Sequence, residues 1–165
     1  MKGISCFAFF CEDVRREASG KETVIGVAAD VMTFRAFPVK VRRLQVYYRM
    51  RFEVGQAYSQ IIIPSVEIDG KPVETASSIS ALPLKMINDA LSRAEHRGHP
   101  YISSAALVQF AEPFPVQVPC QMLAFLNIGE ERILCGALTL ALKPSPETNA
   151  SPHPSEQSPP DDPAS

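Results

Sequence analysis

Apolar and polar positions alternate most regularly between residues 43 and 52. On an extended chain, one face would carry Leu44, Val46, Tyr48, Met50 and Phe52. The opposite face would carry Arg43, Gln45, Tyr47, Arg49 and Arg51. Because successive side chains of a strand point to opposite faces, this period of two predicts a strand with one face in the core and one in solvent.

The first 37 residues contain two apolar runs joined by a charged segment. Residues 4–11 are apolar on both faces, which is typical of a strand that is covered on both sides or lies centrally in a sheet. Most of the local charge falls in residues 13–22, where Gly20 allows a tight turn, and a run rich in β-branched residues follows at 23–29. The pattern predicts a β-hairpin within residues 3–37 that starts the sheet.

Further strands are predicted at residues 58–66, 106–110, 121–128 and 133–142. Asp69-Gly70 is a strong hairpin signal and predicts a return strand at residues 72–75.

Residues 83–97 change period. Leu84, Ile87, Leu91 and Ala94 recur at helical spacing, which predicts one amphipathic helix. Ser80 is a candidate N-cap, and Gly98 is placed to end the helix.

Taken together, these elements predict an all-β fold, an antiparallel β-sandwich of about seven or eight strands with one inserted helix, over residues 1–142. Residues 143–165 are rich in proline, serine and acids and hold no large apolar residue, so we expect a disordered C-terminal tail there.

The run FFCEDVRREASGKETVIGVAAD, followed by a Phe-Pro pair and the basic strand VRRLQVYYRMRF, carries a resemblance to a known family. It resembles an uncharacterised bacterial family whose members open with a Phe-Cys-Asp-Asp-Val/Ile-Arg motif, a Gly-Lys turn and a Gly-Val strand. The resemblance implies a small single-domain β-sandwich with no assigned activity.

Charge gives no sign of a nucleic-acid or membrane partner for the whole domain. The chain has a net charge of -2. Lys143 is the one basic residue of the tail, against Glu147, Glu156, Asp161 and Asp162, so residues 1–142 carry 15 basic and 14 acidic side chains and are near neutral. No apolar run reaches the length of a membrane span, and no small-residue cleavage site follows the first apolar run. We expect a cytoplasmic protein that does not contact a membrane.

No constellation in the sequence indicates a metal, a cofactor or an active site. The four cysteines, Cys6, Cys11, Cys120 and Cys135, lie in apolar runs without metal-ligand spacing, which is typical of free buried thiols, and a bridge from Cys6 to Cys120 or Cys135 is expected only in an exported protein. His96 and His99 lack a third ligand for zinc. We therefore expect no cofactor and no enzymatic activity.

Two polar groups are candidate binding sites. The row Arg43, Gln45, Tyr47, Arg49 and Arg51 has spacing suited to a single-stranded nucleic acid, although pairing of its arginines with carboxylates such as Glu12, Asp13 or Glu67 is the interpretation we favour. Asp13, Arg15 and Lys21 belong to a polar turn that would suit a protein partner or an anion, or would be a solvated turn.

The function that the sequence favours is a non-enzymatic module for protein binding or assembly, with a protein partner or self-association. Two alternatives remain open: a single-stranded nucleic-acid binder that uses the arginine and tyrosine row, and a small hydrolase with an unfamiliar site.

Deletion of residues 143–165 should leave the melting temperature unchanged, because a segment without large apolar side chains adds no buried surface. Differential scanning calorimetry of the full and truncated chains checks this, and a lower melting temperature after truncation would contradict it.

Overall fold

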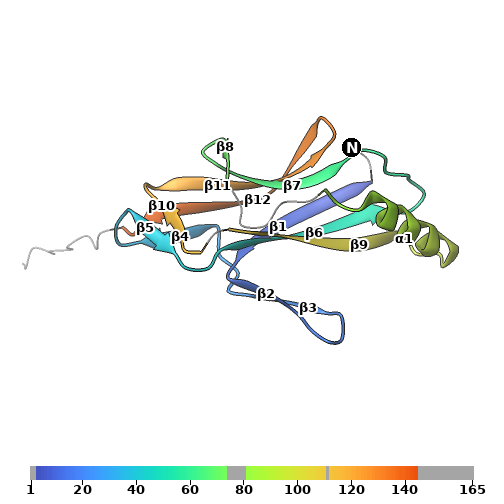
Figure 1. Cartoon of the computed structure of the whole chain (residues 1–165), viewed down its shortest axis with the longest axis horizontal. Coiled ribbons are helices and arrows are strands. Elements are labelled where there is room, and N and C mark those ends of the chain that lie inside the picture. The colour runs from blue at the N-terminus through green and yellow to red at the C-terminus, as the bar shows by residue number, and fades with distance from the viewer. Residues whose placement is uncertain (1–2, 74–80, 111, 145–165) are drawn as a thin grey trace, which may run out of the picture.

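A computed structural model describes residues 3–73, 81–110 and 112–144, which form twelve strands and one helix (Figure 1). In chain order the elements are β1 (Ile4–Cys11), β2 (Asp13–Arg16), β3 (Glu22–Ile25), β4 (Val31–Phe34), β5 (Val39–Val41), β6 (Gln45–Glu53), β7 (Ile62–Ile68), β8 (Lys71–Pro72), α1 (Leu84–His96), β9 (Tyr101–Gln109), β10 (Phe114–Val116), β11 (Cys120–Ile128) and β12 (Glu131–Leu142). The predicted all-β class with one inserted helix is confirmed, with more and shorter strands than expected.

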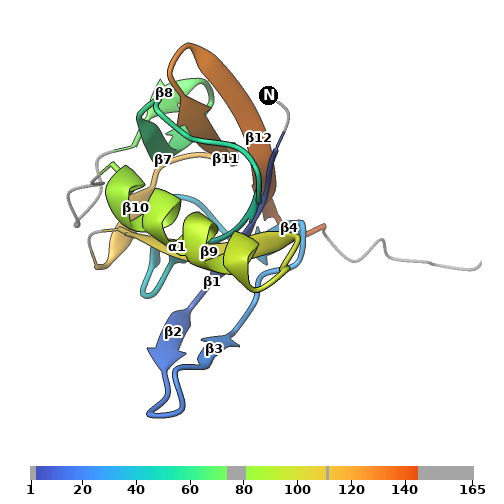
Figure 2. The ribbon, with the colours of Figure 1, turned by 90° about the vertical axis from the view of Figure 1, so that its right-hand side faces the viewer.

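The strands form two main layers. A three-stranded sheet has the order β1-β6-β9, and a five-stranded sheet has the order β4-β12-β11-β7-β8 (Figure 1). All strand pairs are antiparallel apart from β4 and β12, which run parallel. Helix α1 lies at the end of the molecule next to β9, and a ribbon of β2 and β3 projects from the sandwich (Figure 2).

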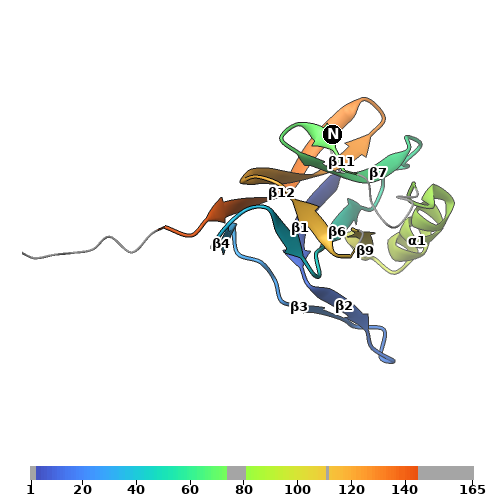
Figure 3. The same cartoon turned by 60° about the vertical axis from the view of Figure 1, so that its left-hand side comes forward.

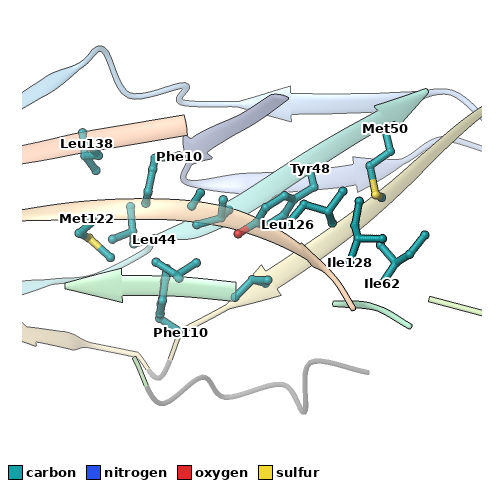
Figure 4. Packing of buried hydrophobic residues seen from close by; sticks show 14 of the residues in the cluster. Phe10, Leu44, Tyr48, Met50, Ile62, Phe110, Met122, Leu126, Ile128 and Leu138 are labelled. Carbon is teal, nitrogen blue, oxygen red and sulfur yellow. The ribbon is translucent and has the colours of Figure 1, made fainter. Parts of the chain in front are cut away.

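The core lies between the two sheets. The predicted apolar face of β6 is confirmed: Val46, Tyr48, Met50 and Phe52 are fully buried. They face apolar side chains of the other sheet, among them Leu126 (Figure 4). The Tyr48 hydroxyl donates a hydrogen bond of 2.7 Å to the Ser65 carbonyl of β7, which ties one sheet to the other and satisfies a buried polar group.

A hairpin is present within residues 3–37, with Gly20 in its turn, but β2 and β3 form it instead of residues 4–11 and 23–29. Strand β1 pairs with β6, from Ile4 opposite Phe52 to Cys11 opposite Gln45. The charged segment after β1 is itself a strand, β2, which pairs with β3 in the separate ribbon. The long amphipathic β6 offers β1 a partner over its whole length, whereas the predicted return strand is only four residues long.

Strand β1 is also not covered on both faces, as its composition had suggested. It is an edge strand of its sheet, and Phe7 and Phe9 are exposed. The outward face of β6, in contrast, is more buried than predicted. Gln45 and Tyr47 are buried instead of facing solvent.

Helix α1 is close to its prediction and buries Ile87, Leu91 and Ala94. Gly98 ends it at a φ of 71°, a backbone conformation that glycine adopts without strain. Ser80 lies outside the described residues, and Pro83 holds the N-cap position without a side-chain hydrogen bond. Among the described residues, no helix has the length and apolarity needed to cross a membrane.

At two loop regions the bounds of the strands can be compared with the prediction. Asp69 and Gly70 form the expected hairpin turn between β7 and β8, both with positive φ. Strand β7 begins at Ile62 instead of residue 58, because the backbone of Tyr58 is hydrogen-bonded to the Asn88 side chain of α1. Residues 74–80 and 145–165 lie outside the described residues, and with them the end of the predicted return strand and nearly all of the predicted tail.

Strand β1 of one sheet packs against β12 of the other. A Cβ atom built on Gly136 would lie 2.5 Å from the backbone oxygen of Ala8, a distance too short for any side chain. Glycine at this position therefore allows the backbone of β1 to approach β12.

Replacement Gly136→Ala should lower the free energy of unfolding by about 1–3 kcal/mol, because the added methyl group must displace β1. Chemical denaturation measures the change. Ala137→Ser, at the exposed neighbouring position, is the control and should have little effect; equal stabilities of the two variants would contradict the close approach.

Candidate binding surface

The solvent-facing side of the β1-β6-β9 sheet is the candidate site, and we call it the outer face. Strand register aligns its side chains in rows across the three strands: Phe7, Arg49 and Ala105 form one row. The next row is Phe9, Tyr47 and Leu107. A third row contains Ser5, Arg51 and Ser103. Because the inward side chains of β6 are buried, the same register that builds the core also fixes which side chains reach this face.

An exposed aromatic pair lies at the β1 edge of the outer face. The rings of Phe7 and Phe9 pack edge to face with their centroids 5.3 Å apart, and the two residues are 50% and 40% exposed. Leu107 and Tyr101 of β9 are exposed on the same face. Large apolar side chains gathered on one sheet face are typical of a surface that binds a partner.

Arg51 and Tyr101 stack beside the aromatic pair. The Arg51 Cζ atom lies 4.1 Å from the centre of the Tyr101 ring, within the range of a cation–π interaction. Together with Ser5, Phe7 and Arg49, these two residues line a surface hollow of about 430 Å³. Among the described residues, no carboxylate lies within ion-pair distance of Arg51.

The β2-β3 ribbon extends away from the sheet (Figure 3) and contacts another region of the outer face through Glu22. Glu22 of β3 accepts a hydrogen bond of 2.5 Å from the Tyr47 hydroxyl and lies 3.4 Å from the Arg49 guanidinium. Burial and the neighbouring Glu22 carboxylate raise the pKa of Tyr47 above its ordinary value. A smaller hollow of about 210 Å³ lies between ribbon and sheet, lined by Val14, Arg16, Glu22, Tyr47 and Leu107 among others.

The predicted row of five residues does not form one exposed stripe. Arg51 is exposed and Arg49 partly so, but Gln45 and Tyr47 are buried. Arg43 precedes β6 and lines a different hollow with Lys40 and Glu112. Arg49 of the row forms its ion pair with Glu22, which was not among the predicted partners, while Glu67 is paired with Arg132 and Asp13 with Arg15. Arg43 also helps to lower the pKa of the predicted partner Asp13.

The polar turn at Asp13, Arg15 and Lys21 belongs to the ribbon. Arg15 Nε lies 3.0 Å from the Asp13 carboxylate, which holds the pKa of that carboxyl below its usual range. Lys21 is exposed, and its carbonyl accepts a hydrogen bond from the Glu17 amide, closing the ribbon turn. These three residues lie on the ribbon, not on the sheet face.

The described residues contain no group of three or more histidine, cysteine or acidic side chains that could hold a metal ion. Burial raises the pKa of the Cys11 thiol to about 11, so this thiol remains protonated at neutral pH. His96 is exposed and hydrogen-bonded through Nδ1 to the Ser92 carbonyl of its own helix.

Sequence reasoning missed four residues of the outer face, Phe7, Phe9, Tyr101 and Leu107, and the ribbon residue Glu22. The run of β1 has a single polar side chain, Ser5, on the same face as Phe7 and Phe9, and one serine is too weak a signal to distinguish the two faces. The exposure of the two phenylalanines follows from the pairing of β1 with β6. This register places Phe7 opposite Arg49 on the outward face of the sheet.

The chain belongs to a family of unknown function, DUF6941, whose family model matches residues 6–100. This match confirms the resemblance to an uncharacterised family. No curated protein and no solved structure matches the chain.

Tyr47→Phe should lower the free energy of unfolding by about 1–2 kcal/mol, because the Glu22 carboxylate loses a partly buried hydrogen bond. Glu22→Gln should lower it as well, and the double variant should show a coupling of about 1 kcal/mol. Urea denaturation of the parent chain, the two single variants and the double variant gives the double-mutant cycle. Asp13→Asn, which alters an exposed pair on the same ribbon, is the control and should have no measurable effect. Additive effects of the two substitutions would contradict contact between ribbon and sheet.

Proposed function

We propose that this member of the DUF6941 family is a non-enzymatic assembly module that associates with a second copy of itself through the outer face. The observation that carries the proposal is the exposed pair Phe7 and Phe9. The pair lies in the open region of that face, the part that the ribbon does not contact. Burial of two phenylalanine rings against a partner removes a large apolar area from water, which is the main driving force of association.

The composition of the outer face supports a protein partner. Phenylalanine, tyrosine and arginine are enriched at the centres of protein interfaces, and the open region of the face holds Phe7, Phe9, Tyr101 and Arg51. The hollow beside Arg51 gives an incoming side chain a place to insert.

The charge distribution supports a second copy as the occupant. Arg51, near one end of the outer face, has no carboxylate partner among the described residues. Glu17, in the turn of the ribbon, contacts the hydroxyls of Ser19 and Thr23 and has no cationic partner in the described ranges of the chain. A two-fold interface must be complementary to itself, and pairing of Arg51 of each copy with Glu17 of the other would satisfy both charges.

The geometry gives less support to a single-stranded nucleic acid. Stacking requires an open ring face, but Tyr47 is only 6% exposed and its hydroxyl is held by Glu22. Arg49 is paired with the same carboxylate, which leaves Arg51 as the unpaired cation of the sheet face.

A non-enzymatic role is supported by the lining of the two outer-face hollows. Glu22 is the one carboxylate among their lining residues, which include no histidine and no cysteine. A carboxylate pair or a nucleophile with a histidine base, as the hydrolase hypothesis requires, is therefore not assembled in these hollows.

Sedimentation equilibrium of the full chain tests the proposal. We expect a monomer–dimer equilibrium at concentrations up to about 100 µM, and we expect the variant with Phe7→Ala and Phe9→Ala to dimerise at least about tenfold more weakly. The matched control carries Ile61→Ala and Val118→Ala, which remove exposed apolar side chains elsewhere, and it should dimerise as the parent chain does.

A charge exchange tests the arrangement of the two copies. Arg51→Glu and Glu17→Arg should each weaken the dimer, and the double variant should recover much of the loss, because the two charges meet across the interface. A chain that stays monomeric at the highest concentration overturns the proposal. Salt-sensitive binding of single-stranded DNA that is lost in Arg51→Glu would favour the nucleic-acid hypothesis instead.

A further inference from the structure

Cys6 and Cys135 lie on β1 and β12, the two strands that pack against each other between the sheets. Cys6 lies on the inward face of β1, between Ile4 and Ala8. Cys135 lies in β12, where pairing with β11 steps from Gly136 opposite Ala124 to Leu134 opposite Phe125. Cys135 is therefore the extra residue of a β-bulge, a device that redirects a side chain. Both cysteines pack against the edge of the core.

The neighbouring Gly136 brings the two strands together. Its Cα lies so close to the Ala8 carbonyl that no side chain fits between β1 and β12. Cys135 is next to Gly136 in sequence, and Cys6 is on the same face of β1 as Ala8, so both cysteines lie beside this close approach. The two thiols are close enough that each shifts the pKa of the other. Cys6 Sγ donates a hydrogen bond of 3.8 Å to the Phe7 carbonyl, and Cys135 Sγ donates one of 3.4 Å to the Ile133 carbonyl.

Accessibility and acidity distinguish this pair from the other two thiols. Cys6 and Cys135 are half-buried, whereas Cys11 and Cys120 are buried. The neighbouring Cys6 thiol lowers the pKa of Cys135, and the Cys135 thiol, together with burial, raises the pKa of Cys6. Cys135 is therefore the thiol that more readily becomes a thiolate, which is the nucleophilic form.

We propose that Cys6 and Cys135 form a redox-active dithiol site that reacts with low-molecular-weight disulfides, such as oxidised glutathione, and closes to an intramolecular disulfide across the seam between β1 and β12. The Cys135 thiolate attacks one sulfur of glutathione disulfide, the S–S bond breaks, and one glutathione thiolate leaves. Cys6 then loses its proton, and its Sγ attacks Cys135 Sγ and displaces the second glutathione. The protein loses two hydrogen atoms, and one glutathione disulfide becomes two glutathione thiols.

The disulfide would join the two sheets covalently. It would link positions 6 and 135 and close a loop that spans most of the described chain, which restricts the unfolded chain strongly. The site is separate from the outer face, because Cys6 points towards the core whereas Phe7 points to solvent. The reaction is therefore independent of self-association and can be tested in a monomer.

The experiment treats the full reduced chain with oxidised glutathione and then blocks the remaining thiols with an alkylating reagent. We expect two alkylated cysteines instead of four, a mass lower by two hydrogen atoms before alkylation, and a Cys6–Cys135 link in the peptide map. The melting temperature should rise by about 10 °C and return to its starting value with reduced glutathione.

Variants identify the reacting pair. Cys6→Ser should keep a glutathione adduct on Cys135, because the second thiol that displaces it is missing. The control Cys120→Ser should still form the link. Four alkylated cysteines after oxidation, or a link between other cysteines, would overturn the proposal. The peptide map of the parent chain decides this even if a variant fails to fold.

Discussion

The register of strand β6 is the constraint on which the rest of the structure depends. It is paired along both edges, with β1 on one side and β9 on the other, and its inward side chains are sealed in the core. A slip of one residue would turn Arg49 and Arg51 towards the core and expose Tyr48 and Met50, at a cost of several kcal/mol for each uncompensated charge. One alternating segment therefore defines the core and the outer face together.

The ribbon divides the outer face into a covered and an open region. Tyr47, which contacts Glu22 of the ribbon, is buried, whereas Phe7 and Phe9 are exposed although they belong to the neighbouring strand. The ribbon therefore shields the Tyr47 ring from solvent but does not shield the two phenylalanine rings on the neighbouring strand. This contrast within a single face, more than the exposure of any one residue, indicates where a partner would add buried surface.

Local patterns predicted local structure well. The apolar face of β6, the Asp69-Gly70 turn and the helix end at Gly98 each depend on neighbours in sequence, and the structure confirms all three. The partner of β1 could not be predicted, because strand pairing depends on contacts between segments about forty residues apart that no local period records.

The candidate site was only partly predictable for the same reason. Arg49 and Arg51 follow from the period of two, but burial of Tyr47 requires a ribbon whose position is set by Glu22. The bulge at Cys135 arises from a mismatch between β11 and β12 and leaves no mark in the composition of either strand.

The parallel pairing of β4 with β12 has a consequence for the order of events during synthesis. Strand β4 leaves the ribosome early, but the strand that it must pair with is the last one of the described chain to be made. Until then β4 has no ladder partner, and β1 lacks the backbone of Gly136 against which it packs. The two-layered fold therefore cannot close from its N-terminal end as the chain emerges, and its completion follows the release of its final strand.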